Sequence, residues 1–114
     1  MEEGMVYNKD LAIRVRDQAT SLAQLDEMKM FGGLGFLLHG NMACGVLGDN
    51  LIVRVGPDAY KDALSKPNVQ VFDYTGRPMN GWIFVTPDGI LKDDELADWV
   101  QAGVQYAQTL PPKQ

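Results

Sequence analysis

The chain has one cysteine and one histidine among its 114 residues, and this scarcity excludes several kinds of chemistry. Cys44 has no second cysteine to pair with, so an internal disulfide cannot form. A structural zinc site takes about four cysteine or histidine ligands and a catalytic one about three, with carboxylates allowed. With only His39 and Cys44 to offer, the sequence predicts no metal site, and nothing in it indicates a cofactor.

A basic excess and a long apolar run are also lacking. Ten lysine and arginine residues stand against 15 aspartate and glutamate residues, and the net charge of −5 argues against direct nucleic-acid binding. No apolar run approaches the length of about 20 residues that a membrane helix needs. The first residues, Met-Glu-Glu-Gly, lack the basic and apolar parts of a secretion signal. We therefore expect a cytoplasmic protein that contacts neither nucleic acid directly nor a membrane.

What the sequence does contain is typical of a globular protein. Apolar residues make up 46% of the chain and charged residues 22%, which is enough apolar surface for a packed core. We expect a single domain over residues 1–114, with its core at about residues 8–107. No internal repeat, low-complexity segment or linker divides the chain.

Residues 30–55 give the clearest structural signal, and they predict three consecutive antiparallel strands. The first predicted turn is His39-Gly40-Asn41-Met42, and the second is Gly48-Asp49-Asn50. Glycine, asparagine and aspartate tolerate the positive φ angles that tight hairpin turns require, and apolar runs flank both turns. Residues 26–29 are expected to be only a lead-in to this meander.

Helices and two further strands are predicted around the meander. Helical spacing of apolar residues and helix-terminus signals predict helices from about residue 8 to 24, 57 to 65 and 93 to 110. Strands are expected at residues 69–73 and 82–86, without a prediction of their place in the sheet. The order α-β-β-β-α-β-β-α predicts an α+β fold, a two-layer sandwich with a mostly antiparallel five-stranded sheet.

The alternation within the meander predicts two unlike faces of the sheet. The bulky face is expected to meet the helices and comprises Leu34, Phe36, Leu38, Met42, Cys44, Val46, Leu51, Val53 and Val55. The opposite face carries small residues, namely Gly33, Gly35, Ala43 and Gly45. Such a face leaves backbone exposed or lets another group approach it closely.

The sequence predicts no catalytic residues. Cys44 lies in the middle of a predicted strand, where a small buried apolar residue is the ordinary explanation. A catalytic pair of Cys44 and His39 would require the two side chains to be aligned on neighbouring strands near the turn. The run Gly32-Gly33-Leu34-Gly35 is followed by a strand, so the helix N-terminus of a phosphate-binding loop is missing, and the glycines indicate a bend or bulge.

Three cations and a carboxylate near the ends of the sheet are the candidate binding residues. Lys29, Arg54 and Arg77 could form a site for a small anion, because arginine suits two-pronged contact with carboxylate or phosphate. Asp73 could instead pair with Arg77 or Arg54 in a structural role. Trp82, also a candidate binding residue, is expected to be a core residue or, at the start of a strand, to line the edge of a groove.

A set of motifs in order along the chain resembles the N-terminal domain of the TfoX/Sxy family. The motifs are Lys29-Met30-Phe31-Gly32-Gly33, Gly40-Asn41-Met42, Arg54-Val55-Gly56, Phe72-Asp73, Gly76-Arg77-Pro78-Met79 and Gly81-Trp82. The similarity covers about residues 8–107 and implies an α+β fold similar to that of secretion chaperones. Named members of the family regulate natural competence as transcription coactivators that act with the cyclic-AMP receptor protein. Those regulators carry a second domain, to which nothing in this chain corresponds.

The expected function is therefore a small regulatory module, not an enzyme, that acts through protein contacts. The resemblance implies a partner in the transcription machinery and supplies no catalytic residues. The contact surface could be the small-residue face with Lys29, Arg54 and Arg77, or an edge of the sheet. The alternative is a protein or enzyme that binds a small molecule or anion through Lys29, Arg54, Asp73 and Arg77. Homodimerisation is expected by analogy with the fold alone.

Overall fold

The computed structural model describes residues 7–30 and 32–113. The helices in this part of the chain are α1 (Lys9–Thr20), α2 (Pro57–Leu64) and α3 (Asp93–Gln108), with a 3-10 turn, η1 (Pro87–Gly89). The strands are β1 (Asp26–Met30), β2 (Gly33–Leu38), β3 (Asn41–Leu47), β4 (Asn50–Arg54), β5 (Val69–Val71) and β6 (Trp82–Val85). All neighbouring strands are antiparallel, in the order β1-β2-β3-β4-β6-β5.

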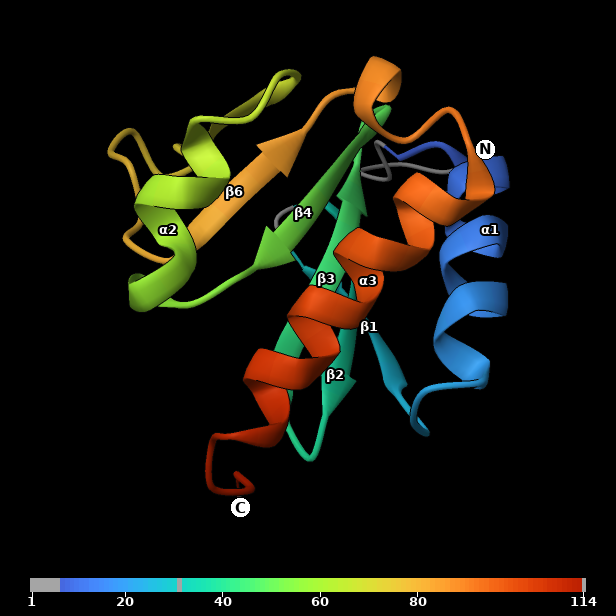
Figure 1. Cartoon of the computed structure of the whole chain (residues 1–114). Helices are drawn as coiled ribbons and strands as arrows, with labels where there is room; N and C mark the ends of the chain where they lie inside the picture. Colours follow the sequence, from blue (N-terminus) through green and yellow to red (C-terminus); the bar gives the residue numbers. More distant parts are fainter. Residues whose placement is uncertain (1–6, 31, 114) are drawn as a thin grey trace.

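The helices lie on one face of the sheet, so the molecule has two layers (Figure 1). Helix α3 packs against β2, β3 and β4 and against α1, while α2 covers β5 and β6. The main core lies between these layers and contains Val15, Phe36, Leu51, Ile83 and Leu96, each almost completely buried. The α+β fold and the two-layer arrangement predicted from the sequence are therefore confirmed.

The prediction of five strands was wrong, because residues 26–30 form a sixth. Strand β1 pairs with β2 along its whole length and is an outer strand of the sheet. Residues 26–29 are exposed, Met30 is half-buried, and charged residues alternate with the two methionines. A short strand that is mostly exposed lacks the run of buried apolar residues by which strands are recognised in a sequence.

The predicted meander and its turns are confirmed as β2, β3 and β4. His39 and Gly40 connect β2 to β3 with positive φ angles of 51° and 85°. Gly48, with a φ angle of 59°, starts the turn into β4. The later strands, whose places the sequence left open, complete the sheet, with β6 between β4 and the short outer strand β5.

Met42 lies on the face opposite to the one predicted. The register between β2 and β3 shifts at Phe36/Leu37, so that Cys44 is opposite Phe36 whereas Met42 is opposite Leu37. The extra residue is Ala43, which joins the helix-side core, while Met42 packs with Leu37 on the other face. The remaining members of the predicted bulky set belong to the helix-side core.

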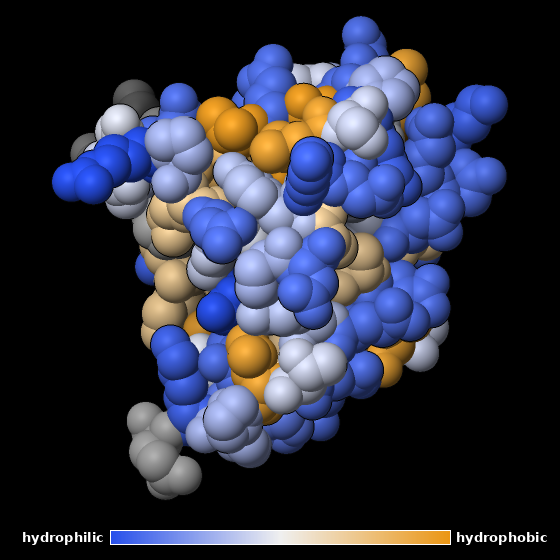
Figure 2. Space-filling view, turned by 60° about the vertical axis from the view of Figure 1, so that its left-hand side comes forward, coloured by the Kyte–Doolittle hydropathy of each residue, from blue (hydrophilic) through white to orange (hydrophobic). Residues whose placement is uncertain are grey.

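The helix-free face is not bare, because methionine side chains cover its glycines. The sulfur atom of Met30 lies where a Cβ of Gly35 would be, and the methyl group of Met42 lies over Gly45. Around them is a second apolar cluster that contains Leu37, Ile52, Phe72, Met79 and Phe84. From the side shown in Figure 2, hydrophobic residues reach the surface in separate patches divided by polar ones.

Two other predicted boundaries differ from the structure. Helix α1 ends at Thr20 instead of near Gln24, and Leu22, which lies inside the predicted helix but after the observed one, is 38% exposed. Strand β5 ends at Val71, and the chain then turns so that Phe72 is buried in the second cluster. Among the helices of the described residues, none has the length and apolar composition to cross a membrane.

Candidate binding site around Arg54

Two of the predicted binding residues, Arg54 and Trp82, lie directly opposite each other on neighbouring strands. Arg54 ends β4, Trp82 begins β6, and the two residues are cross-strand partners. The guanidinium carbon of Arg54 is 4.9 Å from the centre of the Trp82 ring and 5.5 Å from the centre of the Tyr106 ring on α3. Both separations are within the range of cation–π attraction. We refer to Arg54, Trp82 and Tyr106 as the Arg54 site.

The backbone at the end of β4 is fixed by a carbonyl group that accepts two hydrogen bonds. The carbonyl oxygen of Gly81 accepts them from the N–H groups of Val55, at 2.8 Å, and Gly56, at 3.0 Å. Gly81 has a φ angle of 91°, in the region that favours glycine. These hydrogen bonds hold the start of β6 against the end of β4, which sets Trp82 beside Arg54.

Tyr106 reaches the site because Gly56 has no side chain. A Cβ atom at Gly56 would overlap the Tyr106 ring, and the φ angle of Gly56 is 87°. Glycine is the residue that combines this backbone conformation with such a close approach. The motifs Arg54-Val55-Gly56 and Gly81-Trp82, far apart in the sequence, therefore build one structure together with α3.

Arg54 is a half-buried residue, and its guanidinium group is free to bind an acceptor. In the described part of the chain, no carboxylate pairs with Arg54 and no oxygen accepts a hydrogen bond from it. The N–H groups of a guanidinium point outward in its plane. Rings that contact its faces therefore leave these groups available for a planar anion such as a carboxylate. The arrangement restricts the motion of the cation without neutralising it.

A groove of about 360 Å³ lies between α2 and α3 and shares Tyr106 with the Arg54 site. Its lining includes the Trp99 ring and small residues such as Ala63. The Lys66 ammonium nitrogen lies 5.7 Å from the centre of the Trp99 ring, so a second aromatic ring in this region also carries a cation. Asp62 is an acidic residue of the same lining.

Lys29, which the sequence grouped with Arg54, lies elsewhere. It is on the outer strand β1, separated from β4 by β2 and β3. Its cross-strand partner is Leu34, a residue of the helix-side core, whereas Arg54 shares the opposite face of the sheet with Ile52. The structure therefore does not bring Lys29 and Arg54 into one site.

Asp73 and Arg77 are exposed residues of the loop between β5 and β6. The N–H of Gly76 donates a hydrogen bond of 2.8 Å to the carbonyl oxygen of Asp73, which closes a turn in this loop. Within residues 7–30 and 32–113, Asp73 forms no ion pair with Arg77 or Arg54. The loop packs onto the helix-free face through Met79, whose N–H donates to the carbonyl oxygen of Phe72.

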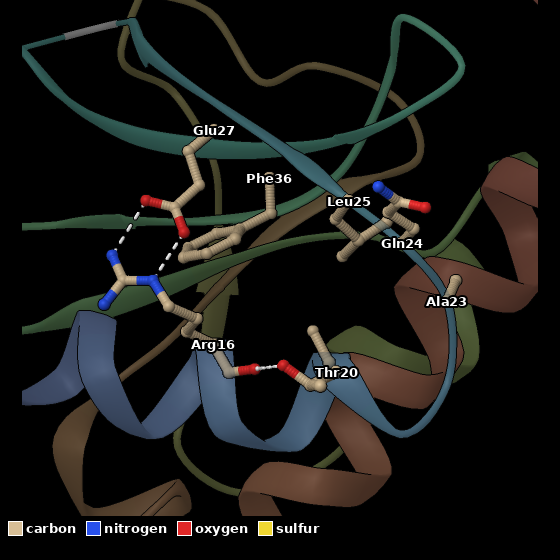
Figure 3. Close-up of a pocket in the computed structure, with 8 residues that line it drawn as sticks. Arg16, Thr20, Ala23, Gln24, Leu25, Glu27 and Phe36 are labelled. Carbon is tan, nitrogen blue, oxygen red and sulfur yellow. Dashed lines mark hydrogen bonds and ion pairs between the residues drawn. The ribbon is translucent and has the colours of Figure 1, made fainter.

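A separate hollow of about 230 Å³ lies between the end of α1 and β1 (Figure 3). Arg16 and Glu27 point toward each other at one side of it, and Arg16 Nη2 donates to Glu27 Oε1 at 2.8 Å. This hydrogen bond lowers the pKa of Glu27 below its ordinary value and raises that of Arg16. The charges of this hollow already satisfy each other, so the Arg54 site is the better candidate for binding.

Cys44 is completely buried in the helix-side core, and burial raises the pKa of its thiol to about 12. His39 is exposed in the turn between β2 and β3. A thiol that stays protonated at neutral pH is a poor nucleophile. Among the described residues, no three histidine, cysteine or acidic side chains are placed to hold a metal ion.

Tyr106 is the residue of the site that the sequence analysis missed. It lies seven residues after Trp99 and three after Gly103, so all three residues lie on one side of α3. That spacing could have indicated a ring at this position, but only the fold shows that it reaches Arg54 across Gly56.

Comparison with known families identifies the class of domain. The model of the TfoX N-terminal domain matches residues 17–107, which is most of the chain and includes every residue of the Arg54 site. Neither the curated proteins nor the solved structures contain a significant match to the chain. The similarity to secretion chaperones that was expected from the resemblance therefore stays a prediction.

Proposed function

The chain belongs to the TfoX N-terminal domain family, and from this membership and the geometry of Arg54 we propose that it is a regulatory module that acts through protein contacts. No chemical step is part of the proposal. The partner expected from the family is a component of the transcription machinery. The proposed contact surface is the Arg54 site with the adjoining groove between α2 and α3.

The observation that carries the proposal is that Arg54 is held by aromatic rings and forms no ion pair among the described residues. Its guanidinium group contacts two aromatic rings and has no carboxylate partner among the described residues. A half-buried cation with restricted motion loses less conformational entropy on binding than a mobile surface side chain does. Arginine and aromatic residues are also the types that most often dominate binding energy at protein interfaces.

The chemistry of this surface favours an acidic partner segment. The N–H groups of Arg54 would donate hydrogen bonds to the carboxylate of an aspartate or glutamate. The groove beside Tyr106 offers space for a neighbouring apolar side chain. Lys66 adds a second positive charge on the Trp99 ring. The whole chain is acidic, with a net charge of −5, so attraction of an acidic partner depends on this local charge.

The proposal is tested by affinity capture from lysate with wild type, Arg54→Ala and Arg54→Lys, followed by quantitative mass spectrometry. Lys61→Ala is the matched control, because Lys61 is an exposed cation of α2 that does not line the groove. A partner that wild type and Lys61→Ala retain should fall at least about tenfold with Arg54→Ala, which corresponds to the loss of a hot-spot residue. Arg54→Lys should also weaken capture, since lysine lacks the planar fork.

Circular dichroism must show that each variant is folded. The proposal fails if folded Arg54→Ala captures the same proteins in the same amounts as wild type. A captured partner should then be measured directly by calorimetry at low and high salt, where binding through Arg54 is expected to weaken as salt increases.

A further inference from the structure

The outer edge of β1 is open in the described structure. Strand β1 is the first in the sheet order and, among the described strands, pairs with β2 alone. It is five residues long and mostly exposed, and Met28 at its centre is 53% exposed. The backbone N–H and C=O groups on such an edge can pair with another strand.

The two faces of β1 carry different side chains. Glu27 and Lys29 are opposite Phe36 and Leu34, so both lie on the helix side of the sheet. Met28 is opposite Gly35 and lies on the helix-free side. Lys29 has no ion-pair partner in the described residues, whereas Glu27 pairs with Arg16 of α1.

Symmetry limits how two copies of β1 can pair with each other. A twofold axis perpendicular to the sheet keeps the helix side of one copy next to the helix side of the other, so the axis must pass beside a residue. Centred on Glu27, the pairing places the two Glu27 carboxylates opposite each other. Centred on Lys29, it places two ammonium groups together. Centred on Met28, it places Glu27 opposite Lys29 on both sides of the axis.

We propose that β1 is a homodimer interface, in which β1 of one copy pairs with β1 of a second copy in the antiparallel register centred on Met28. Opposite charges on cross-strand partners stabilise a sheet, and like charges destabilise it, so this register is the favoured one of the three. Each Glu27 would then lie between Arg16 of its own chain and Lys29 of the second copy.

The dimer goes beyond the proposed function and does not depend on it. The Arg54 site lies at β4 and β6, on the other side of β2 and β3 from β1. Pairing through β1 would join two sheets into one continuous sheet, with the helices of both copies on the same face, and would leave both Arg54 sites open. A strand-edge interface of this length is small, so we expect association in the micromolar range or weaker.

Charge variants test the pairing by sedimentation equilibrium of the full chain. Lys29→Glu and Glu27→Lys should each weaken self-association at least about tenfold, because each converts two attractive pairs into two repulsive ones. An equimolar mixture of the two variants should recover association, since every acidic residue then faces a lysine. Lys61→Glu, with the same charge change on an exposed residue of α2, is the control and should associate like wild type.

A cysteine at the centre of the strand tests the register independently of charge. Met28→Cys places an exposed thiol next to the axis, while Cys44 is buried and does not compete. Cross-strand partners have Cβ atoms about 4.5 to 5.5 Å apart, close enough for a disulfide after a small shift. Under mild oxidation, Met28→Cys should form covalent dimers at least about tenfold faster than the exposed control Lys61→Cys.

Two results would overturn the proposal. One is a wild-type chain that remains monomeric up to about 1 mM, a concentration that detects even weak association. The other is covalent dimerisation of Met28→Cys at the rate of Lys61→Cys. If Glu27→Lys fails to fold after losing its contact with Arg16, the Met28→Cys experiment still tests the β1–β1 pairing.

Discussion

Gly103 sets how closely α3 can approach the sheet. A Cβ atom at this position would overlap the carbonyl oxygen of Ala43, the extra residue in β3. The lack of a side chain at Gly103 lets α3 pack closely against β3 at its extra residue, Ala43. This contact joins two backbones, which cannot move apart as easily as a flexible side chain can rotate away.

We expect Gly103→Ala to lower the free energy of unfolding by about 2 kcal/mol, as overpacked core sites do. The loss should appear although alanine is favoured over glycine in a helix by about 1 kcal/mol. Urea unfolding measures the difference, with Gln101→Ala on the exposed side of α3 as control. Equal or greater stability of Gly103→Ala would show that α3 can shift away from β3 at little cost.

Cys44 couples stability to pH at the alkaline end. Its thiol has a pKa raised by burial from 9.0 to about 12, so the unfolded chain ionises at a lower pH than the folded chain does. Unfolding then releases a proton, and stability is lost as the pH rises from about 9 toward 12.

The contribution of Cys44 is isolated by comparing wild type with Cys44→Ala. We expect wild type to lose more free energy of unfolding than Cys44→Ala between pH 8 and about pH 11, although the variant is less stable at pH 8 because of its smaller side chain. All other residues are the same in the two proteins, so their contributions cancel in the difference. Parallel pH profiles for the two proteins would mean that the thiol is not desolvated in the fold.

At the scale of elements, an ion pair connects β1 to the helix layer in the part of the chain that the structure describes. Arg16 of α1 contacts Glu27 of β1, and the side chains are 45% and 33% exposed. Partly exposed pairs contribute little, since solvent screens them. The strand is held mainly by its backbone pairing with β2.

We expect Glu27→Gln to lower the free energy of unfolding by only about 0.5 kcal/mol at pH 7. Because the hydrogen bond from Arg16 lowers the pKa of Glu27, this contribution is present above the ordinary pKa of 4.5 and is lost as the pH falls through the lower, folded value. Thermal unfolding of wild type and variant should therefore converge in acid. Asp26→Asn, an exposed neighbour, is the control, and a difference that persists in acid would contradict the assignment.

Which elements could be predicted depended on whether their signals were local. Residues close in sequence encode the turns at His39-Gly40 and Gly48-Asp49 and the helix predicted at about residues 93–110, and these predictions are confirmed. Strand β1 is mostly exposed, with only Met30 half-buried, and was missed. The bulge at Ala43 was missed for another reason, because its contact is with Gly103, which lies far along the chain.

At the scale of the whole molecule, the candidate site was predicted only in part. Arg54 and Trp82 were chosen for their chemistry and lie together, but the order of the strands separates them from Lys29. Tyr106 joins them through a helix whose position depends on the complete core. Residue types indicate what a site can do, whereas its membership follows from contacts between distant segments.

The methionines on the helix-free face make this surface sensitive to oxidation. Met30 and Met42 lie against the backbone of Gly35 and Gly45. Oxidation adds an oxygen atom to the sulfur of methionine and makes the side chain polar. A sulfoxide at Met30 would bring a polar oxygen atom to the apolar cluster beside Gly35. Methionine residues oxidised on this face of the sheet would therefore stay oxidised until a reductase restored the thioether.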